Sequence, residues 1–193
     1  GYFDAATSFR HALFQTVSIV STTGFASSDF NLWPDFSRYV LLLLMFVGGC
    51  SGSTAGGMKV SRFVILLKVT WAELRRTIHP RLVYSIKMGG RNVPPVVVGN
   101  VTRFFYLYMI VFSTLTLLIS LTGISMLDSM GIIAACMSSV GPAFGIVGPT
   151  ATYADVSTFG RLVVIAAMIL GRLEIFTLLI IMRPDFWRVK RNW

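Results

Sequence analysis

Charged residues are scarce in this sequence, and acidic residues are the scarcest of them. Only 13% of the 193 residues are Asp, Glu, Lys or Arg, and only eight are acidic, whereas 54% are hydrophobic. An ordinary soluble domain has about 25% charged residues. The low charge and the mean hydropathy of +0.72 therefore indicate that water is not the main solvent of this chain.

Cysteine and processing signals are scarce too. The two cysteines, Cys50 and Cys136, lie in apolar segments, and no CxxC or Cys/His pairing suggests a metal site. We expect both to be small buried residues. The N-terminus has no charged region followed by a short apolar stretch and a cleavage site, and the abrupt start at Gly1 suggests a fragment of a longer protein.

The net charge of +9 does not indicate a nucleic-acid partner, because the basic residues lie at helix ends instead of on a soluble face. Nine of the 17 lie between Lys59 and Arg103, and four follow Met182. Five of the eight acids lie in the opposite connections. By the positive-inside rule the basic connections and the C-terminus are predicted to be cytoplasmic.

Three apolar stretches are long enough to cross a membrane, which takes about 20 helical residues: 37–69, 101–121 and 158–182. Two shorter apolar segments, 4–20 and 127–137, end in the glycine motifs STTGF (21–25, the first turn) and SSVGP (138–142, the second turn). Helices of this length are typical of re-entrant segments that dip into the membrane and return.

An internal repeat relates the two halves of the chain. FSRYV at 36–40 aligns with FGRLV at 159–163, and the same register pairs Gly48 with Gly171. We therefore predict an all-α integral membrane protein of repeated helix, re-entrant pore helix and helix units, as in potassium channels, with one helix broken by a Gly-rich loop. Asn100 or Thr102 is expected to cap the leading helix of the second repeat. The predicted divisions are 1–80 (pore helix 4–20, filter 21–25, broken helix 37–77, with no leading helix), a cytoplasmic linker 81–98, and 99–193 (helix 101–122, pore helix 127–137, filter 138–142, helix 158–182, basic tail).

The two turns carry the first candidate site. Bare backbone at membrane depth is tolerated only inside protein or beside a water-filled cavity, and Gly24 and Gly141 can adopt positive φ. Their neighbouring carbonyls can then face one axis, as in a filter that replaces the hydration shell of potassium. Ordinary tight turns are the alternative, but the repeat and the acids on the outer side favour a filter. The predicted filter residues are Thr22, Thr23, Gly24, Phe25, Ser139, Val140, Gly141 and Pro142, with the carbonyls of Thr22, Thr23, Val140 and Gly141 as potassium ligands.

A run of small residues, the glycine loop (48–57), interrupts the first long stretch. Five glycines in ten residues, each costing about 1 kcal/mol in a helix, should break it, and such breaks usually line an ion pathway. Close helix packing on small residues is the alternative. The loop consists of Gly48, Gly49, Cys50, Ser51, Gly52, Ser53, Thr54, Ala55, Gly56 and Gly57.

Two segments of this loop resemble enzyme motifs. The segment GSTAGGMK at 52–59 has Met58 where a phosphate-binding loop needs Lys. The GxSG pattern around Ser51 resembles rhomboid-type intramembrane serine proteases, which need a membrane-embedded His. His79 falls at the cytoplasmic end, and His11 is expected to be a polar packing residue. We expect an ion-conducting protein without enzymatic activity. The alternatives are an intramembrane protease that uses Ser51 and a membrane scaffold that conducts no ions.

Arg172 lies inside the last predicted crossing, where a charge by default marks function. In the alignment of the two repeats, Arg172 corresponds to Gly49. Its guanidinium can donate to carbonyls of the glycine loop or repel a cation. The alternative is a structural pair with Glu174.

Together these motifs closely resemble those of the Trk-type potassium uptake proteins of bacteria, in the Trk/Ktr/HKT superfamily. The resemblance covers STTGF, GGCSGSTAGGMK at 48–59, SSVGP, GRLEIFTLL at 171–179 and RPDFW at 183–187. It implies four repeats around one pore, of which this chain holds most of the third and all of the fourth. It also implies potassium as substrate, with the glycine loop as gate below the filter and Arg172 meeting it.

The same resemblance implies a homodimer, embedded in lipid, in the bacterial inner membrane. It further implies a cytoplasmic TrkA-like regulatory subunit through which a nucleotide, NAD or ATP, governs the gate. No covalent cofactor is implied. Phe25 and Pro142 stand where the potassium-channel motif TVGYG has Tyr.

Overall fold

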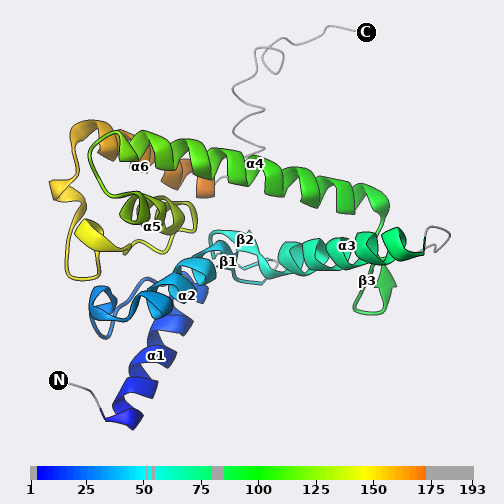
Figure 1. The fold of residues 1–193 in the computed structure, drawn as a ribbon, viewed down its shortest axis with the longest axis horizontal. Coiled ribbons are helices and arrows are strands. Elements are labelled where there is room, and N and C mark those ends of the chain that lie inside the picture. Colours follow the sequence, from blue (N-terminus) through cyan, green and yellow to red (C-terminus); the bar gives the residue numbers. More distant parts are fainter. Residues whose placement is uncertain (1–3, 51, 54, 80–84, 173–193) are drawn as a thin grey trace, which may run out of the picture.

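The computed structural model describes residues 4–50, 52–53, 55–79 and 85–172. The predicted all-α architecture is confirmed: helices dominate, and each strand has two residues. The predictions for Ser51, Thr54, Glu174, the last part of helix 158–182 and the basic tail lie outside the described residues. In chain order (Figure 1) the elements are α1 (Ala5–Val20), η1 (Phe30–Leu32), α2 (Asp35–Phe46), β1 (Val47–Gly48), β2 (Met58–Lys59), α3 (Val60–Ile78), β3 (Lys87–Met88), β4 (Arg91–Asn92), α4 (Pro95–Ser120), α5 (Met126–Met137), η2 (Gly145–Val147), η3 (Tyr153–Asp155) and α6 (Thr158–Arg172).

The glycine loop breaks the first long apolar stretch, as predicted. Helix α2 ends at Phe46 and α3 begins at Val60. Between them, β1 pairs in parallel with β2, so that Val47 lies opposite Met58 and Gly48 opposite Lys59. The pairing closes the loop at its base, since it brings the end of α2 and the start of α3 side by side.

Helix α4 is, among the described residues, the one helix both long and apolar enough to cross a membrane. It begins at Pro95, with Pro94 at the cap position, so the predicted cap at Asn100 or Thr102 is wrong. Proline suits the first helical position because its missing N–H would have no partner there and its φ is already helical. The helix therefore extends several residues into the predicted linker.

The remainder of the predicted linker contains a β-hairpin. Strands β3 and β4 pair antiparallel around Gly89 and Gly90, whose φ values are +54° and +79°. Two positive φ angles in a two-residue loop are the mark of a type I′ turn, which glycine favours. The Lys68 ammonium in α3 donates to the Lys87 carbonyl at 2.6 Å, which ties the hairpin to the helix before it.

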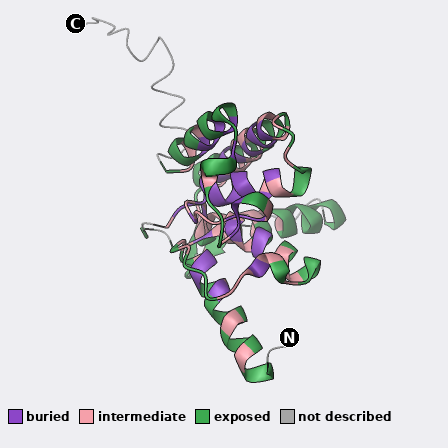
Figure 2. Cartoon of the chain, turned by 90° about the vertical axis from the view of Figure 1, so that its left-hand side faces the viewer, coloured by how far each residue is buried: buried purple, intermediate pink, exposed green. Residues whose placement is uncertain are grey.

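Helix α5 lies at the centre of the core. Every residue from Gly131 to Met137 is buried, and α2, α4 and α6 all pack against this helix. Figure 1 shows α5 below α4 and α6, enclosed by the connection that follows it. The N-terminal half of α1, in contrast, projects from the rest and is largely exposed (Figure 2). The buried C-terminal half of α5 holds the turn that follows it inside the protein.

Candidate functional site

The two short helices α1 and α5 end with the same hydrogen-bond pattern. After α1, the Thr22 N–H donates to the Ile19 carbonyl (3.1 Å) and the Thr23 N–H to the Ser18 carbonyl (3.0 Å). After α5, the residues at the same offset repeat both bonds: Ser139 N–H to Cys136 carbonyl (3.1 Å) and Val140 N–H to Ala135 carbonyl (2.9 Å). Each pair of bonds is a Schellman motif. The backbone geometry thus repeats along with the sequence.

The left-handed position of each motif is held by a residue other than glycine. Thr22 has φ +56° and Ser139 φ +57°. A Schellman motif usually has glycine there, and a β-branched residue such as Thr at positive φ is an outlier that costs roughly 1–3 kcal/mol. Strain of this kind persists where the surrounding structure enforces it, and it clusters at functional sites.

Two residues further on, both turns have the predicted glycines at positive φ. Gly24 has φ +74° and Gly141 φ +101°. The prediction that these glycines adopt left-handed conformations is confirmed. The sequence contained no local signal for Thr22 and Ser139, since neither residue type favours that conformation; only their matching places in the repeat link them.

The two turns lie in direct contact. A Cβ added to Gly24 would overlap the Val140 carbonyl oxygen and stand 3.1 Å from Cδ of Pro142. The Cα of Gly24 therefore lies against the backbone of the second turn, at a distance that only glycine allows. The bends related by duplication meet at one place, as a shared axis requires.

Hydroxyl groups hold one carbonyl of each turn. Ser18 Oγ donates to the Phe25 carbonyl at 2.6 Å, and Tyr153 Oη donates to the Gly141 carbonyl at 2.7 Å. The donor in the first case is in helix α1. In the second case it is in η3, in the connection between the second turn and α6; this segment (143–157) and the segment between the first turn and α2 (26–34) are named the outer connections. Tyr153 was not among the predicted site residues, because its partner is a backbone atom, which leaves no trace in the sequence.

The glycine loop packs directly against both turns. A Cβ on Gly56 would overlap the Ser138 carbonyl and stand 2.9 Å from Ser139 Oγ. The Gly56 N–H also donates to Thr22 Oγ1 at 3.4 Å. Ser138 Oγ in turn donates to the carbonyl of Met45, at the end of α2. The loop residue Gly56 is therefore enclosed by backbone and hydroxyl groups of the first and second turns.

Lys59 closes the loop from its far end. Its ammonium donates to the Ser53 carbonyl at 2.8 Å, to the Ala55 carbonyl, and to Ser53 Oγ at 3.5 Å. Hydrogen bonds from a charged donor are stronger than neutral ones. Lys59 was not predicted as part of the site, although it follows the glycine run directly. It fixes the middle of the loop against the start of α3.

A cavity of about 230 Å³ adjoins the loop between α4 and α6. Its described lining residues include three basic side chains, Lys59, Arg62 and Arg172, and no acidic one. Arg62 also lies over the Phe104 ring, 4.2 Å from its centre. A second cavity, of about 580 Å³, has Arg172 in its lining together with Ser139 and Gly141. Arg172 is thus placed between the loop and the second turn.

The other predicted loop residues fall in varied settings. Gly48 is buried in β1, and Gly52 has φ +87° with no atom within 4 Å of an added Cβ. Cys136 is buried as predicted, but Cys50 is exposed, so that prediction is wrong. The apolar neighbours of Cys50 in sequence belong to α2, whereas Cys50 lies in the exposed part of the loop, with Gly52 and Ser53.

The two histidines lie in α1 and at the end of α3. His11 Nδ1 lies 2.9 Å from Ser27 Oγ, a contact between α1 and the outer connection that fits the polar packing role predicted for it. His79 is the C-cap of α3. Ser51, the proposed protease nucleophile, lies outside the described residues.

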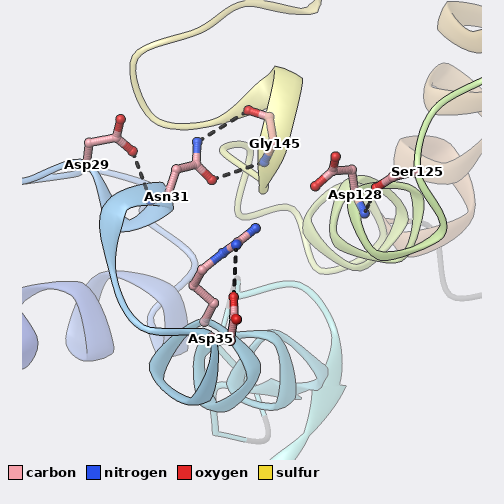
Figure 3. Close-up of polar contacts among 7 residues, drawn as sticks. Asp29, Asn31, Asp35, Ser125, Asp128 and Gly145 are labelled. Atoms are coloured by element: carbon pink, nitrogen blue, oxygen red, sulfur yellow. Dashed lines mark hydrogen bonds and ion pairs between the residues drawn. The ribbon is translucent and has the colours of Figure 1, made fainter.

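The outer connections of the two repeats are joined by a side-chain amide (Figure 3). Asn31 Oδ1 accepts from the Gly145 N–H at 3.0 Å, and Asn31 Nδ2 donates to the Gly145 carbonyl at 3.3 Å. Asp29 accepts from the Asn31 N–H, and Asp128, in the first turn of α5, points toward Gly145. Asp35 pairs with Arg38 at 3.3 Å. The Asn31 contacts hold the two connections that follow the turns against each other.

Comparison with known proteins places this geometry in a family. Residues 1–188 match a family model, TrkH, described as a cation transport protein. The chain is 46% identical to the Trk system potassium uptake protein TrkH of Vibrio parahaemolyticus over 93% of its own length and 37% of that protein. It is 39% identical to the TrkH of Escherichia coli strain K12 over 97% of its length and 38% of that protein.

A solved structure agrees. The crystal structure of the potassium transporter TrkH from Vibrio parahaemolyticus superposes with a TM-score of 0.87 at 44% identity, covering 97% of this chain and 40% of that one. The chain therefore spans a little over a third of the length of the relatives it matches.

Proposed function

The chain belongs to the TrkH family of cation transport proteins, and on that premise we propose that it forms half of a pore through which potassium enters the bacterial cell. The observation that carries the proposal is the contact between Gly24 and the Val140 carbonyl, which brings two matched turns together. The relatives named above are called potassium uptake proteins. Since the chain covers 37–38% of their length, the remaining turns of a ring would come from the rest of the protein.

The proposed ligands are the carbonyls of Thr22, Thr23, Val140 and Gly141. A ring of such oxygens replaces the hydration shell of the ion, and it needs turns held inside protein, away from lipid. The burial of α5 and the two Schellman motifs supply that support. A carbonyl oxygen has two lone pairs, so Gly141 can accept from Tyr153 and still face an ion.

The glycine loop is the proposed gate. It lies against both turns through Gly56, and Arg172 lines the cavity beside it. A guanidinium at this place opposes the passage of a cation by charge repulsion, and a loop rich in glycine can move aside at little steric cost. The proposed gate consists of residues 48–57 and Arg172. The hydrogen bonds from Lys59 to the carbonyls of Ser53 and Ala55 tether the loop to the start of α3.

The assembly and its setting are also part of the proposal. We place the protein in the bacterial inner membrane as a multi-pass homodimer, with the basic connection 59–103 and the C-terminus on the cytoplasmic side. A TrkA-like regulatory subunit that binds NAD or ATP would act on the gate from that side. The β3–β4 hairpin lies in this connection.

Potassium uptake by the full-length protein tests the proposal. The gene is expressed in a bacterium that lacks its own potassium uptake systems, and growth at low potassium and rubidium uptake are measured. We expect both to be restored, and purified protein in liposomes to carry potassium. If intact protein inserted in liposomes gives no potassium flux, the proposal is contradicted.

A further inference from the structure

The two turns differ in how their carbonyls are held. In the first turn, the donor is Ser18, one residue before Ile19 near the end of α1. The offset that pairs Gly24 with Gly141 pairs Ser18 with Ala135. Alanine has no hydroxyl, so Ala135 cannot donate a hydrogen bond to a carbonyl of the second turn as Ser18 does in the first.

Tyr153 supplies a hydroxyl to the second turn from outside α5, but it acts on the Gly141 carbonyl, whereas the residue that the offset pairs with Phe25 is Pro142. Its Oη donates to the Gly141 carbonyl at 2.7 Å and lies 3.4 Å from Sγ of Cys136 in α5. Burial is the main cause that raises the pKa of Tyr153 well above its ordinary value, so the hydroxyl keeps its proton at neutral pH. It is therefore a permanent donor to this carbonyl.

Gly141 itself has open space around its Cα. Gly24 is confined by the Val140 carbonyl, but no atom lies within 4 Å of a Cβ added to Gly141. Its φ of +101° is one that glycine can leave easily. A cavity of about 580 Å³ also adjoins Gly141 and Ser139. The hydrogen bond from Tyr153 acts directly on the Gly141 carbonyl.

We infer that Tyr153 is a positioning residue for ion discrimination, which holds the Gly141 carbonyl at the spacing that suits potassium. The inference rests on the proposed function. Ion selectivity depends on the cavity that the carbonyls form and on their field strength. A carbonyl released from Tyr153 can move toward a smaller ion, and without the positive hydrogen of the donor beside it the carbonyl presents a stronger field to that ion. Both changes favour sodium relative to potassium.

Replacing Tyr153→Phe in the full-length protein removes the hydroxyl and keeps the ring. We expect the ratio of potassium to sodium uptake to fall about threefold to tenfold, the size that the loss of one hydrogen bond gives. The control is Tyr106→Phe, at an exposed position of α4, which should leave the ratio unchanged. Rubidium uptake competed with sodium measures the ratio in cells.

A second measurement separates positioning from stability. Purified protein is heated in potassium or in sodium, and the difference between the two unfolding temperatures reports ion preference without transport. Tyr153→Phe should reduce that difference, whereas a merely structural role would lower both temperatures equally. An unchanged uptake ratio, or an unchanged temperature difference, would overturn the inference. Failure of the wild-type protein to carry potassium at all would instead count against the proposed function.

Discussion

The Cα of Gly24 faces the carbonyl oxygen of Val140 so closely that no side chain fits between them. The two residues belong to different repeats, and each follows a pore helix that ends in a Schellman motif. The contact joins the two halves of the chain at the turns themselves. The outer connections are joined separately, through Asn31 and Gly145.

Gly24→Ala should lower potassium uptake by the full-length protein by about tenfold or more, because it adds a clash with Val140 to the roughly 1–3 kcal/mol cost of positive φ. The matched control is Gly123→Ala. Gly123 also has positive φ (+87°), but no atom lies within 4 Å of an added Cβ. Equal uptake by the two variants at equal abundance would show that the contact does not matter for conduction.

Gly56→Ala should raise the flux that occurs without the regulatory subunit. The added methyl group overlaps the Ser138 carbonyl, so the glycine loop has to move away from both turns. Gly52→Ala is the control within the same loop, since its φ of +87° gives similar backbone strain with open space around it. Rubidium efflux from liposomes measures this basal flux. A Gly56→Ala protein as tightly closed as wild type would argue against the loop as gate.

Lys59→Met should also raise basal flux, by about threefold or more, because the loop loses a charged donor to the carbonyls of Ser53 and Ala55. Methionine keeps most of the side-chain volume. Lys68→Met is the control, because Lys68 likewise donates to a backbone carbonyl, that of Lys87, but away from the loop. If both variants behave alike in the efflux assay, the tether has no part in gating.

Arg172→Ala should increase basal flux by removing a positive charge beside the loop, and Arg172→Lys should retain most of the barrier. The pair separates charge from packing, since lysine preserves the charge but not the shape of the guanidinium. Single-channel recording or efflux at several salt concentrations gives the readout. Lower flux in the alanine variant at normal abundance would contradict a barrier role.

Much of the fold follows from local patterns in the sequence. Apolar length predicted the helices, five glycines predicted the break between α2 and α3, and the repeat predicted that α1 and α5 have corresponding places. These features depend on the preferences of neighbouring residues, which a sequence displays directly. The predicted start of α4 was wrong. The prediction relied on the polar cap candidates Asn100 and Thr102, whereas the helix begins several residues earlier, at Pro95.

The places where the backbone bends could be predicted from side-chain identity: Gly24 and Gly141 are at positive φ because glycine alone adopts that conformation at low cost. The tertiary structure alone decided what meets at those bends. Thr22 and Ser139 are held left-handed, Tyr153 reaches Gly141, and Lys59 reaches Ser53, all by hydrogen bonds that involve backbone atoms. Every residue has such atoms, so nothing in the order of the side chains reveals which of them will be paired across the fold.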